Sequence, residues 1–264
     1  MDVWKGEFSF FYFGKDYNMK KWLYRILMIV CIVVFCFSSY KLFVIFDQNH
    51  KLEKETEELE QFVVKKDDTN QKKVLNVDWE SLKKKNDEIV AWVYMPECNI
   101  SFPIVQGSDN SYYLTHTSKK EYNPYGAIFL NADNSFDFSD PNSIIFGHST
   151  DDGGMFTPLK KFNDSKFFSE NPNYFILTPK QNYKCVNVSF AKTIEGSVYY
   201  NSVVDDAMLA EVYQQATQVS DTIVKNKKLV TLSTCDLDYG FHSNHRLVLT
   251  SFLEEVDDKI YIEN

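Results

Sequence analysis

The chain has 264 residues, with 37 acidic and 28 basic side chains and a formal net charge of −9. This charge disfavours nucleic-acid binding, which depends on basic patches, so no nucleic-acid partner is expected. Aromatic residues make up 16% of the chain against only 9 glycines and 7 prolines, which excludes a largely disordered protein and leaves room for one large domain with appendages.

The first predicted element is a membrane-spanning helix over residues 22–46. Three polar residues interrupt the apolar run between Ile26 and Phe46, and a bilayer core needs about 20 such residues. The basic residues on the N-terminal flank are Lys15, Lys20, Lys21 and Arg25. The positive-inside rule therefore puts residues 1–21 in the cytoplasm and the bulk of the chain outside a single-pass cell-membrane anchor. A cleavable signal peptide is the alternative, but the run is long for one and no small-residue cleavage site follows it.

Residues 47–74 are expected to form a charged stalk and linker, followed by a globular domain over residues 75–264. The stretch from Lys51 to Lys66 is highly charged with a weak helical pattern, which is typical of a solvated segment. Asp78 is placed to cap a short helix that runs to about Asn86.

Short strands dominate the rest of the chain. Strand signals cover residues 89–94, 100–105, 127–131, 143–146, 174–178 and 183–193. One helix is predicted from Asp206 to about Gln218, where apolar residues recur at helical spacing. Many short strands with few helices indicate a mainly β fold, either a barrel or a sandwich, and periodicity does not choose between them.

Residues 227–252 predict a hairpin that carries a nucleophile. Leu229 to Thr234 alternates as a strand that ends at Cys235, and Arg246 opens the returning strand. The thiol and the guanidinium would then meet at one rim of the domain. A neighbouring cation favours the thiolate, and arginine can also hold the oxyanion of a tetrahedral intermediate. The alternative is a structural cysteine beside a surface arginine.

The other cysteines offer no competing site. Cys31 and Cys36 fall in the predicted membrane helix, where they serve as small apolar residues. Cys98 and Cys185 could pair, although sequence cannot test the geometry, and Cys235 is then the thiol left over. No Cys-x-x-Cys pair or zinc-type His/Cys spacing occurs, so no metal is expected.

A thiol nucleophile needs a proton shuttle, and the chain has 5 histidines. His148 ends the strand-like run 143–148, which places it at a rim. His242 and His245 lie in the loop after the cysteine strand and are nearer in sequence. The residues alone do not decide between these histidines.

Several motifs resemble those of a known family. The string Thr231-Leu232-Ser233-Thr234-Cys235, with Arg246 opening the next strand, resembles the signature of the sortases, cysteine transpeptidases of Gram-positive bacterial surfaces. Ile144-Ile145-Phe146-Gly147-His148, followed by Gly154-Met155-Phe156 and Leu159, is similar to the histidine motif of class B sortases. Further similar segments, in family order between residues 77 and 252, are residues 87–92, 103–106, 110–114 and 126–130.

The resemblance implies an eight-stranded β-barrel with flanking helices, anchored by the N-terminal membrane helix. It implies a catalytic site at the barrel rim formed by Cys235, His148 and Arg246. The family's substrate contacts would fall on Asn110, Leu114, Phe146, Ser233 and Asp236. The chain departs from the family at Phe146, where many members have tyrosine, and at Ser149-Thr150, where Asn-Met is more usual. Both departures bear on substrate preference.

The resulting hypothesis is a transpeptidase that needs no metal or organic cofactor. Cys235 would attack a threonyl carbonyl in the sorting-signal peptide of a secreted surface protein, with Arg246 and a backbone N–H near Asp236 stabilising the oxyanion. His148 would protonate the departing amine, and a peptidoglycan-precursor amine would then accept the acyl group. The alternatives are pilin polymerisation, a wall-directed cysteine peptidase or amidase, and a non-catalytic binding domain. The exact sorting motif, the acceptor amine and the oligomeric state do not follow from the sequence.

Overall fold

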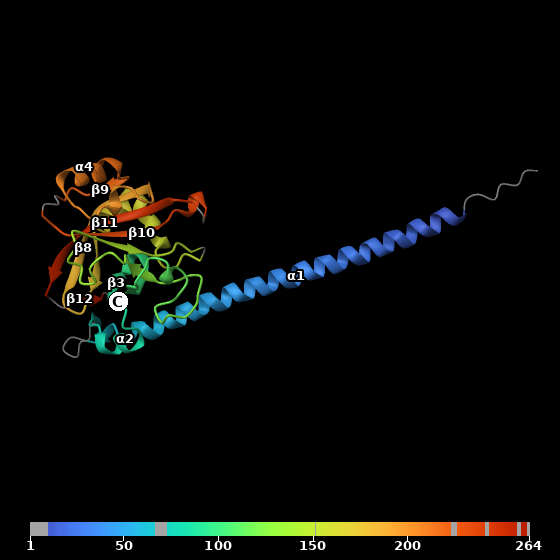
Figure 1. The fold of residues 1–264 in the computed structure, drawn as a ribbon, viewed down its shortest axis with the longest axis horizontal. Helices are drawn as coiled ribbons and strands as arrows, with labels where there is room; N and C mark the ends of the chain where they lie inside the picture. The colour runs from blue at the N-terminus through green and yellow to red at the C-terminus, as the bar shows by residue number, and fades with distance from the viewer. Residues whose placement is uncertain are drawn as a thin grey trace, which may run out of the picture. The chain divides into compact units, whose positions relative to one another are not determined.

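The computed structural model describes residues 10–66, 73–150, 152–222, 226–240, 243–257 and 260–262 (Figure 1). The chain divides into two compact units, residues 1–50 and 51–264. The first unit consists of most of helix α1 (Phe10–Glu60), and the second contains the end of that helix and all the strands.

Helix α1 contains the segment with membrane-spanning character. Among the described residues, the stretch Lys20–Glu60 is the one helix long and apolar enough to cross a bilayer, with an 18-residue window of mean hydropathy 2.4. None of that window is buried within the protein. Exposed apolar side chains on a helix of this length are what a bilayer core accommodates, so α1 is a candidate membrane span.

The last turns of α1 belong to the second unit and are packed within it, unlike the solvated segment that their charges indicate. Leu59 is fully buried. The Glu55 carboxylate accepts hydrogen bonds from the Ser118 hydroxyl at 2.8 Å and from the Lys119 backbone N–H at 3.0 Å. Glu60 accepts a hydrogen bond from the Ser101 hydroxyl at 2.8 Å. The glutamates that look solvated in the sequence therefore find polar partners on the β-rich body.

A small antiparallel sheet follows α1, formed by β1 (Val64–Lys66), β2 (Lys73–Leu75) and β12 (Ile260–Ile262) in the order β1-β2-β12. Helix α2 (Trp79–Lys85) comes next. The Asp78 side chain accepts a hydrogen bond from the Ser81 N–H at 3.1 Å, which confirms the predicted N-cap.

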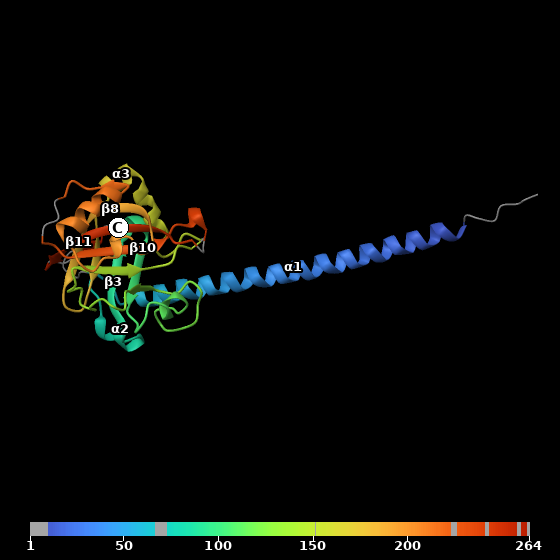
Figure 2. The same ribbon diagram turned by 45° about the horizontal axis from the view of Figure 1, so that its top comes forward.

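The second unit is built around a closed eight-stranded barrel, which confirms the expected fold. The strands are β3 (Ile89–Met95), β4 (Ile100–Val105), β5 (Ile128–Leu130), β6 (Asn142–Phe146), β7 (Asn173–Leu177), β8 (Asn182–Ile194), β10 (Leu229–Cys235) and β11 (His245–Val256). The order is β11-β10-β6-β5-β4-β3-β7-β8, and pairing of β8 with β11 closes the ring. Strand β11 therefore lies between β8 and β10, and the three strands can be followed in both ribbon views (Figures 1 and 2).

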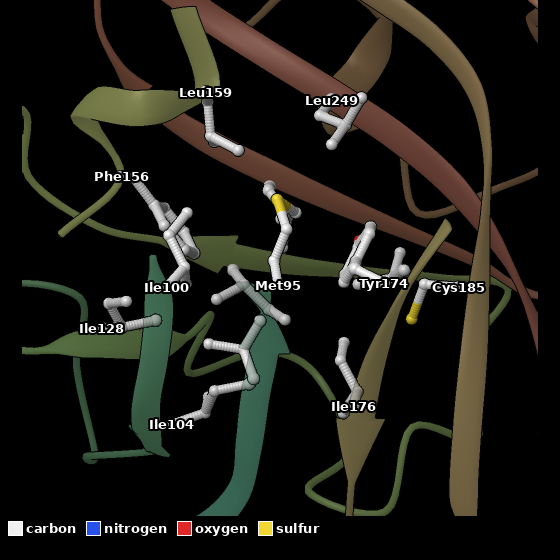
Figure 3. Close-up of a cluster of buried hydrophobic side chains, with 14 of the residues drawn as sticks. Met95, Ile100, Ile104, Ile128, Phe156, Leu159, Tyr174, Ile176, Cys185 and Leu249 are labelled. Atoms are coloured by element: carbon white, nitrogen blue, oxygen red, sulfur yellow. The ribbon is translucent and has the colours of Figure 1, made fainter. Parts of the chain in front are cut away.

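The barrel interior is filled by alternate residues of its strands. Val230 and Leu232 of β10 belong to the largest buried cluster together with Leu249 of β11. In Figure 3, Met95, Leu159 and Leu249 converge on this interior. Each such side chain contributes about 1.5–3 kcal/mol by its burial. The predicted strand alternation of the cysteine hairpin is therefore what separates core residues from rim residues.

Two helices and short 3₁₀ turns flank the barrel. They are α3 (Ser165–Glu170) and α4 (Asp206–Gln215). Helix α4 buries Met208, Leu209 and Val212 in a cluster shared with β11. It ends before the predicted Gln218, because Gln218–Val219 pair with β8 as the short strand β9.

Candidate active site

The predicted nucleophile lies at the end of β10, directly opposite the predicted oxyanion donor. In the antiparallel register of β10 and β11, Cys235 pairs with Arg246. The returning strand begins one residue earlier than expected, at His245, and continues to Val256. The hairpin thus brings the thiol-bearing and guanidinium-bearing residues to one edge of the barrel.

The predicted proton shuttle reaches the same edge from the other neighbour of β10. Strand β6 is parallel to β10, with Phe146 opposite Ser233, and the Gly147 N–H donates to the Ser233 carbonyl at 3.1 Å. Because parallel strands end at the same edge of a sheet, His148 follows β6 where Cys235 ends β10. A Cβ at Gly147 would lie 2.6 Å from the Phe156 ring, so a side chain there would push the histidine loop outward.

A pocket of about 230 Å³ opens at this edge. Its lining residues are Asn110, Leu114, Phe129, Phe146, Gly147, His148, Glu195, Tyr200, Ser233, Thr234, Cys235 and Arg246. The pocket therefore brings together all three predicted catalytic residues and four of the five predicted substrate contacts.

His148 is held by contacts of both its ring and its backbone. Its Nε2 lies 2.9 Å from the Leu114 carbonyl oxygen, which can only accept, so Nε2 carries a proton. In the neutral ring the other nitrogen, Nδ1, is then the acceptor. The His148 carbonyl accepts a hydrogen bond from the Phe156 N–H at 3.1 Å.

Ser149 connects the histidine loop to the cysteine strand. Its hydroxyl is 2.8 Å from the Cys235 carbonyl and 2.8 Å from the Thr234 hydroxyl. The carbonyl accepts from Ser149, so the Thr234 hydroxyl donates to Ser149 in turn. The buried Ser149 hydroxyl therefore ties the residue after His148 to the backbone at the end of β10.

The Arg246 guanidinium donates hydrogen bonds to two parts of the barrel. Its Nη1 donates to the backbone carbonyls of Ser243 at 2.9 Å and His245 at 3.0 Å. Its Nη2 donates to the Glu195 carboxylate at 2.7 Å. The sequence analysis did not single out Glu195, because only the pairing of β8 with β11 brings it to this loop.

One wall of the pocket is aromatic. The Phe146 ring stacks on Tyr200 with centroids 6.3 Å apart and packs against Phe129 at 5.4 Å. The Tyr200 hydroxyl hydrogen-bonds to the Ser233 hydroxyl at 2.7 Å. Phe146 lacks the hydroxyl of the usual tyrosine, and Tyr200 provides one on the same wall. Neither Phe129 nor Tyr200 was predicted, since nothing local in the sequence marks them as pocket residues.

Comparison with known proteins identifies the family. The sortase domain model matches residues 93–254, which is more than half of the chain. The chain belongs to the sortase family.

Curated and solved relatives narrow the class. This sortase is 28% identical over 238 residues to sortase B of Listeria monocytogenes, covering 88% of the chain and 97% of the relative. It resembles solved sortase B from B. anthracis with a TM-score of 0.68 at 27% identity, covering 80% of this chain and all of that one. A Staphylococcus aureus sortase B–substrate complex gives a TM-score of 0.63 at 25% identity, covering 68% and 85%. The protein is a class B sortase, a membrane-associated cysteine transpeptidase.

Asp236 is the predicted substrate contact that does not line the pocket. It is only 1% exposed, and its carboxylate accepts from the Asp238 N–H at 3.1 Å and pairs with Lys192 at 3.6 Å. Its own N–H donates to the His245 carbonyl at 3.0 Å. The substrate contact assigned to Asp236, and oxyanion donation by a backbone N–H near it, therefore stay predictions for this sortase.

Two other histidines of the β-rich body, His116 and the candidate His245, have aromatic partners. The His245 ring stacks on Tyr239 at 3.6 Å, and the His116 ring stacks on Tyr112 at 4.0 Å. His242 lies outside the described residues. Among the described histidines, His148 is the one that lines the pocket of the sortase.

The remaining thiols of the β-rich body are buried. Cys98 and Cys185 are both free, so the disulfide that the sequence allowed does not form. Burial raises the pKa of Cys98 to about 12 and raises the pKa of Cys185 further. Cys235 is partly exposed, which leaves it as the accessible thiol of the barrel.

Proposed function

We propose that this sortase cleaves a C-terminal sorting signal of secreted proteins after threonine and transfers the acyl group to an amine of a cell-wall precursor. Cys235 is the nucleophile, His148 the general acid and base, and Arg246 the oxyanion donor. The proposal is carried by one observation: Cys235 and Arg246 are register partners on β10 and β11, and His148 lines the same pocket.

The chemistry follows from these positions. The Cys235 thiolate attacks the threonyl carbonyl carbon, and Arg246 N–H groups stabilise the resulting oxyanion. The C–N bond then breaks, the His148 imidazolium protonates the leaving amine, and a thioester remains on Cys235. An incoming amine attacks the thioester, neutral His148 takes its proton, and the thiolate is released with a new amide formed.

The pocket walls suggest how the sorting signal is held. The solved Staphylococcus aureus relative is a complex with its substrate, which supports peptide binding at the equivalent edge here. We assign signal contacts to Asn110, Leu114, Phe146 and Ser233, which line the pocket. The Asn110 amide is braced by Asn131 at 2.7 Å, so it presents a fixed polar group beside the aromatic wall.

The domain organisation follows from hydropathy and charge. We place residues 22–46 in the membrane and residues 1–21 in the cytoplasm, because basic residues precede the apolar run. The catalytic domain then lies outside the cell, where secreted proteins and wall precursors are found. We place its start before residue 75, because Leu59 and Val63 are buried in it.

Turnover by the full chain in detergent micelles tests the triad, with a library of fluorogenic sorting peptides as substrates. Cys235→Ala, His148→Ala and Arg246→Ala are each expected to lower turnover by at least about 10³-fold. His245→Ala is the matched control, because its ring stacks on Tyr239; its turnover should stay within about threefold of the unaltered chain. Equal losses for both histidine variants would contradict the assignment of His148.

The fate of the acyl group is tested by mass spectrometry of the products with and without an added amine. An amide product that replaces the free acid is expected. Exclusive hydrolysis in the presence of amine would contradict wall transfer and favour a peptidase. A product joined through a protein lysine would instead indicate pilin polymerisation.

A further inference from the structure

We propose that Glu195 is a positioning residue of this sortase: its carboxylate holds the Arg246 guanidinium at the pocket so that two N–H groups remain for the oxyanion. This inference rests on the proposed role of Arg246. It adds a fourth side chain to the site, contributed by the turn that follows β8, which carries none of the three proposed catalytic residues.

The hydrogen bonds of Arg246 show why Glu195 is decisive. A guanidinium has five N–H donors, and Arg246 makes three hydrogen bonds to described residues, which leaves two. Two of the three acceptors, the carbonyls of Ser243 and His245, belong to the hairpin that carries Arg246 itself. Glu195 is the acceptor that comes from a different part of the barrel, so it fixes the direction of the guanidinium relative to the body.

The position of Glu195 is itself constrained by the barrel. Strand β8 pairs with β11, with Ile194 opposite His245. Immediately after this pair, the Glu195 N–H donates to the Asn244 carbonyl at 2.8 Å. The backbone of Glu195 is therefore fixed to the loop of the hairpin. The 2.7 Å hydrogen bond between its carboxylate and Nη2 of Arg246 joins two side chains whose backbones are both held in place.

A fixed guanidinium is needed for catalysis. The arginine side chain carries about 2 kcal/mol of rotamer entropy when free, and an oxyanion donor acts only if it already points to where the charge develops. A shift of about 1 Å in a catalytic group can cost about 10²-fold in rate. Loss of Glu195 should therefore appear in kcat, because the oxyanion forms in the transition state rather than in the bound substrate.

The test compares kcat and KM of the full chain in detergent micelles, using the fluorogenic peptide that the unaltered chain cleaves best. Glu195→Ala is expected to lower kcat about 20-fold with KM within about twofold. Glu195→Gln, whose amide oxygen still accepts a hydrogen bond, should lower kcat only about three- to fivefold. Glu80→Ala is the matched control, since Glu80 forms an exposed ion pair with Lys84 and does not line the pocket.

A double-substitution cycle separates positioning from other roles. In the Arg246→Lys background the guanidinium is absent, so Glu195→Ala should change the residual kcat by less than about twofold. The unfolding temperature should stay within about 2 °C, because exposed ion pairs add little stability. These two results together support positioning through Arg246.

Other outcomes overturn the proposal. A raised KM with unchanged kcat would make Glu195 a substrate contact. An equal loss of kcat in both backgrounds would show that Glu195 acts without Arg246. Absence of Cys235-dependent cleavage by the unaltered chain would overturn the proposed function together with this inference, whereas cleavage that Glu195→Ala leaves intact would overturn this inference alone.

Discussion

Cys235 owes its setting to its neighbours on both sides of β10. Arg246 lies opposite it on β11, and Ser149 donates a hydrogen bond to its carbonyl from the histidine loop. The strand alternation that sends Val230 and Leu232 into the core leaves Ser233 and Cys235 on the pocket. Because Cys235 is the last residue of β10, its thiol is accessible at the rim of the barrel.

Thiol reactivity separates Cys235 from the buried cysteines. At pH 8, iodoacetamide is expected to label Cys235 in the folded full chain and to leave Cys98 unlabelled. Burial raises the pKa of Cys98 to about 12, so its thiol stays protonated through pH 10 and ionises only near that value. Site-resolved peptide mass spectrometry over pH 7–10 is the measurement, with denatured protein as the control in which all thiols react. Equal labelling of both cysteines at pH 8 would contradict this prediction.

At the scale of elements, the end of α1 acts as part of the catalytic domain. Its buried Glu55 is bonded to Ser118 and Lys119. The segment that contains these two residues follows Leu114, whose carbonyl accepts from the His148 ring. The end of α1 therefore supports the segment next to the predicted catalytic histidine, His148, and a soluble piece that begins at residue 75 would lack this support.

Leu59→Ala tests how much the helix end contributes. The side chain is fully buried, so its truncation should lower the free energy of unfolding by about 2–4 kcal/mol through lost burial and a residual cavity. Glu57→Ala, an exposed position on the same helix, should change it by less than about 0.5 kcal/mol. Urea unfolding of the full chain in detergent, followed by tryptophan fluorescence, measures both variants. A Leu59→Ala effect as small as that of Glu57→Ala would show that the helix end is not part of the folded domain.

At the scale of the whole molecule, the chain combines a candidate membrane helix with a closed barrel that carries the pocket. The strands at the two ends of the barrel's strand order, β8 and β11, pair with each other and complete the ring. The same pairing brings Glu195, which follows β8, next to Arg246 near the start of β11. The apolar segment of α1 is the candidate membrane span of this membrane-associated enzyme.

The orientation across the membrane can be measured directly. External protease added to intact protoplasts is expected to digest the domain beyond residue 50 and to leave a protected fragment that contains residues 1–21. This orientation is expected because the basic residues that precede the apolar run favour the cytoplasmic side of the membrane. Lysed protoplasts, in which both parts are digested, are the control. Protection of the barrel with loss of the N-terminal segment would reverse the orientation.

Local patterns in the sequence were sufficient for much of this protein. Hydropathy alone located the candidate membrane helix, and period-two alternation located most barrel strands. Asp78, as a helix-capping residue, predicted the start of α2. The motif around Cys235 pointed to the family, which the domain match then established. These features depend on neighbours within one strand or one helical turn, and such neighbours are visible in the chain itself.

Contacts between distant segments needed the tertiary structure. It put Glu195, Tyr200 and Phe129 on the pocket, turned Asp236 away from it, and docked the charged end of α1 on the barrel. Each of these depends on which strands become neighbours when the ring closes, and no local period encodes that choice. Sequence therefore determined which residues could do the chemistry, and barrel closure decided which of them meet, because pairing across many intervening residues is set by the packing of the whole body.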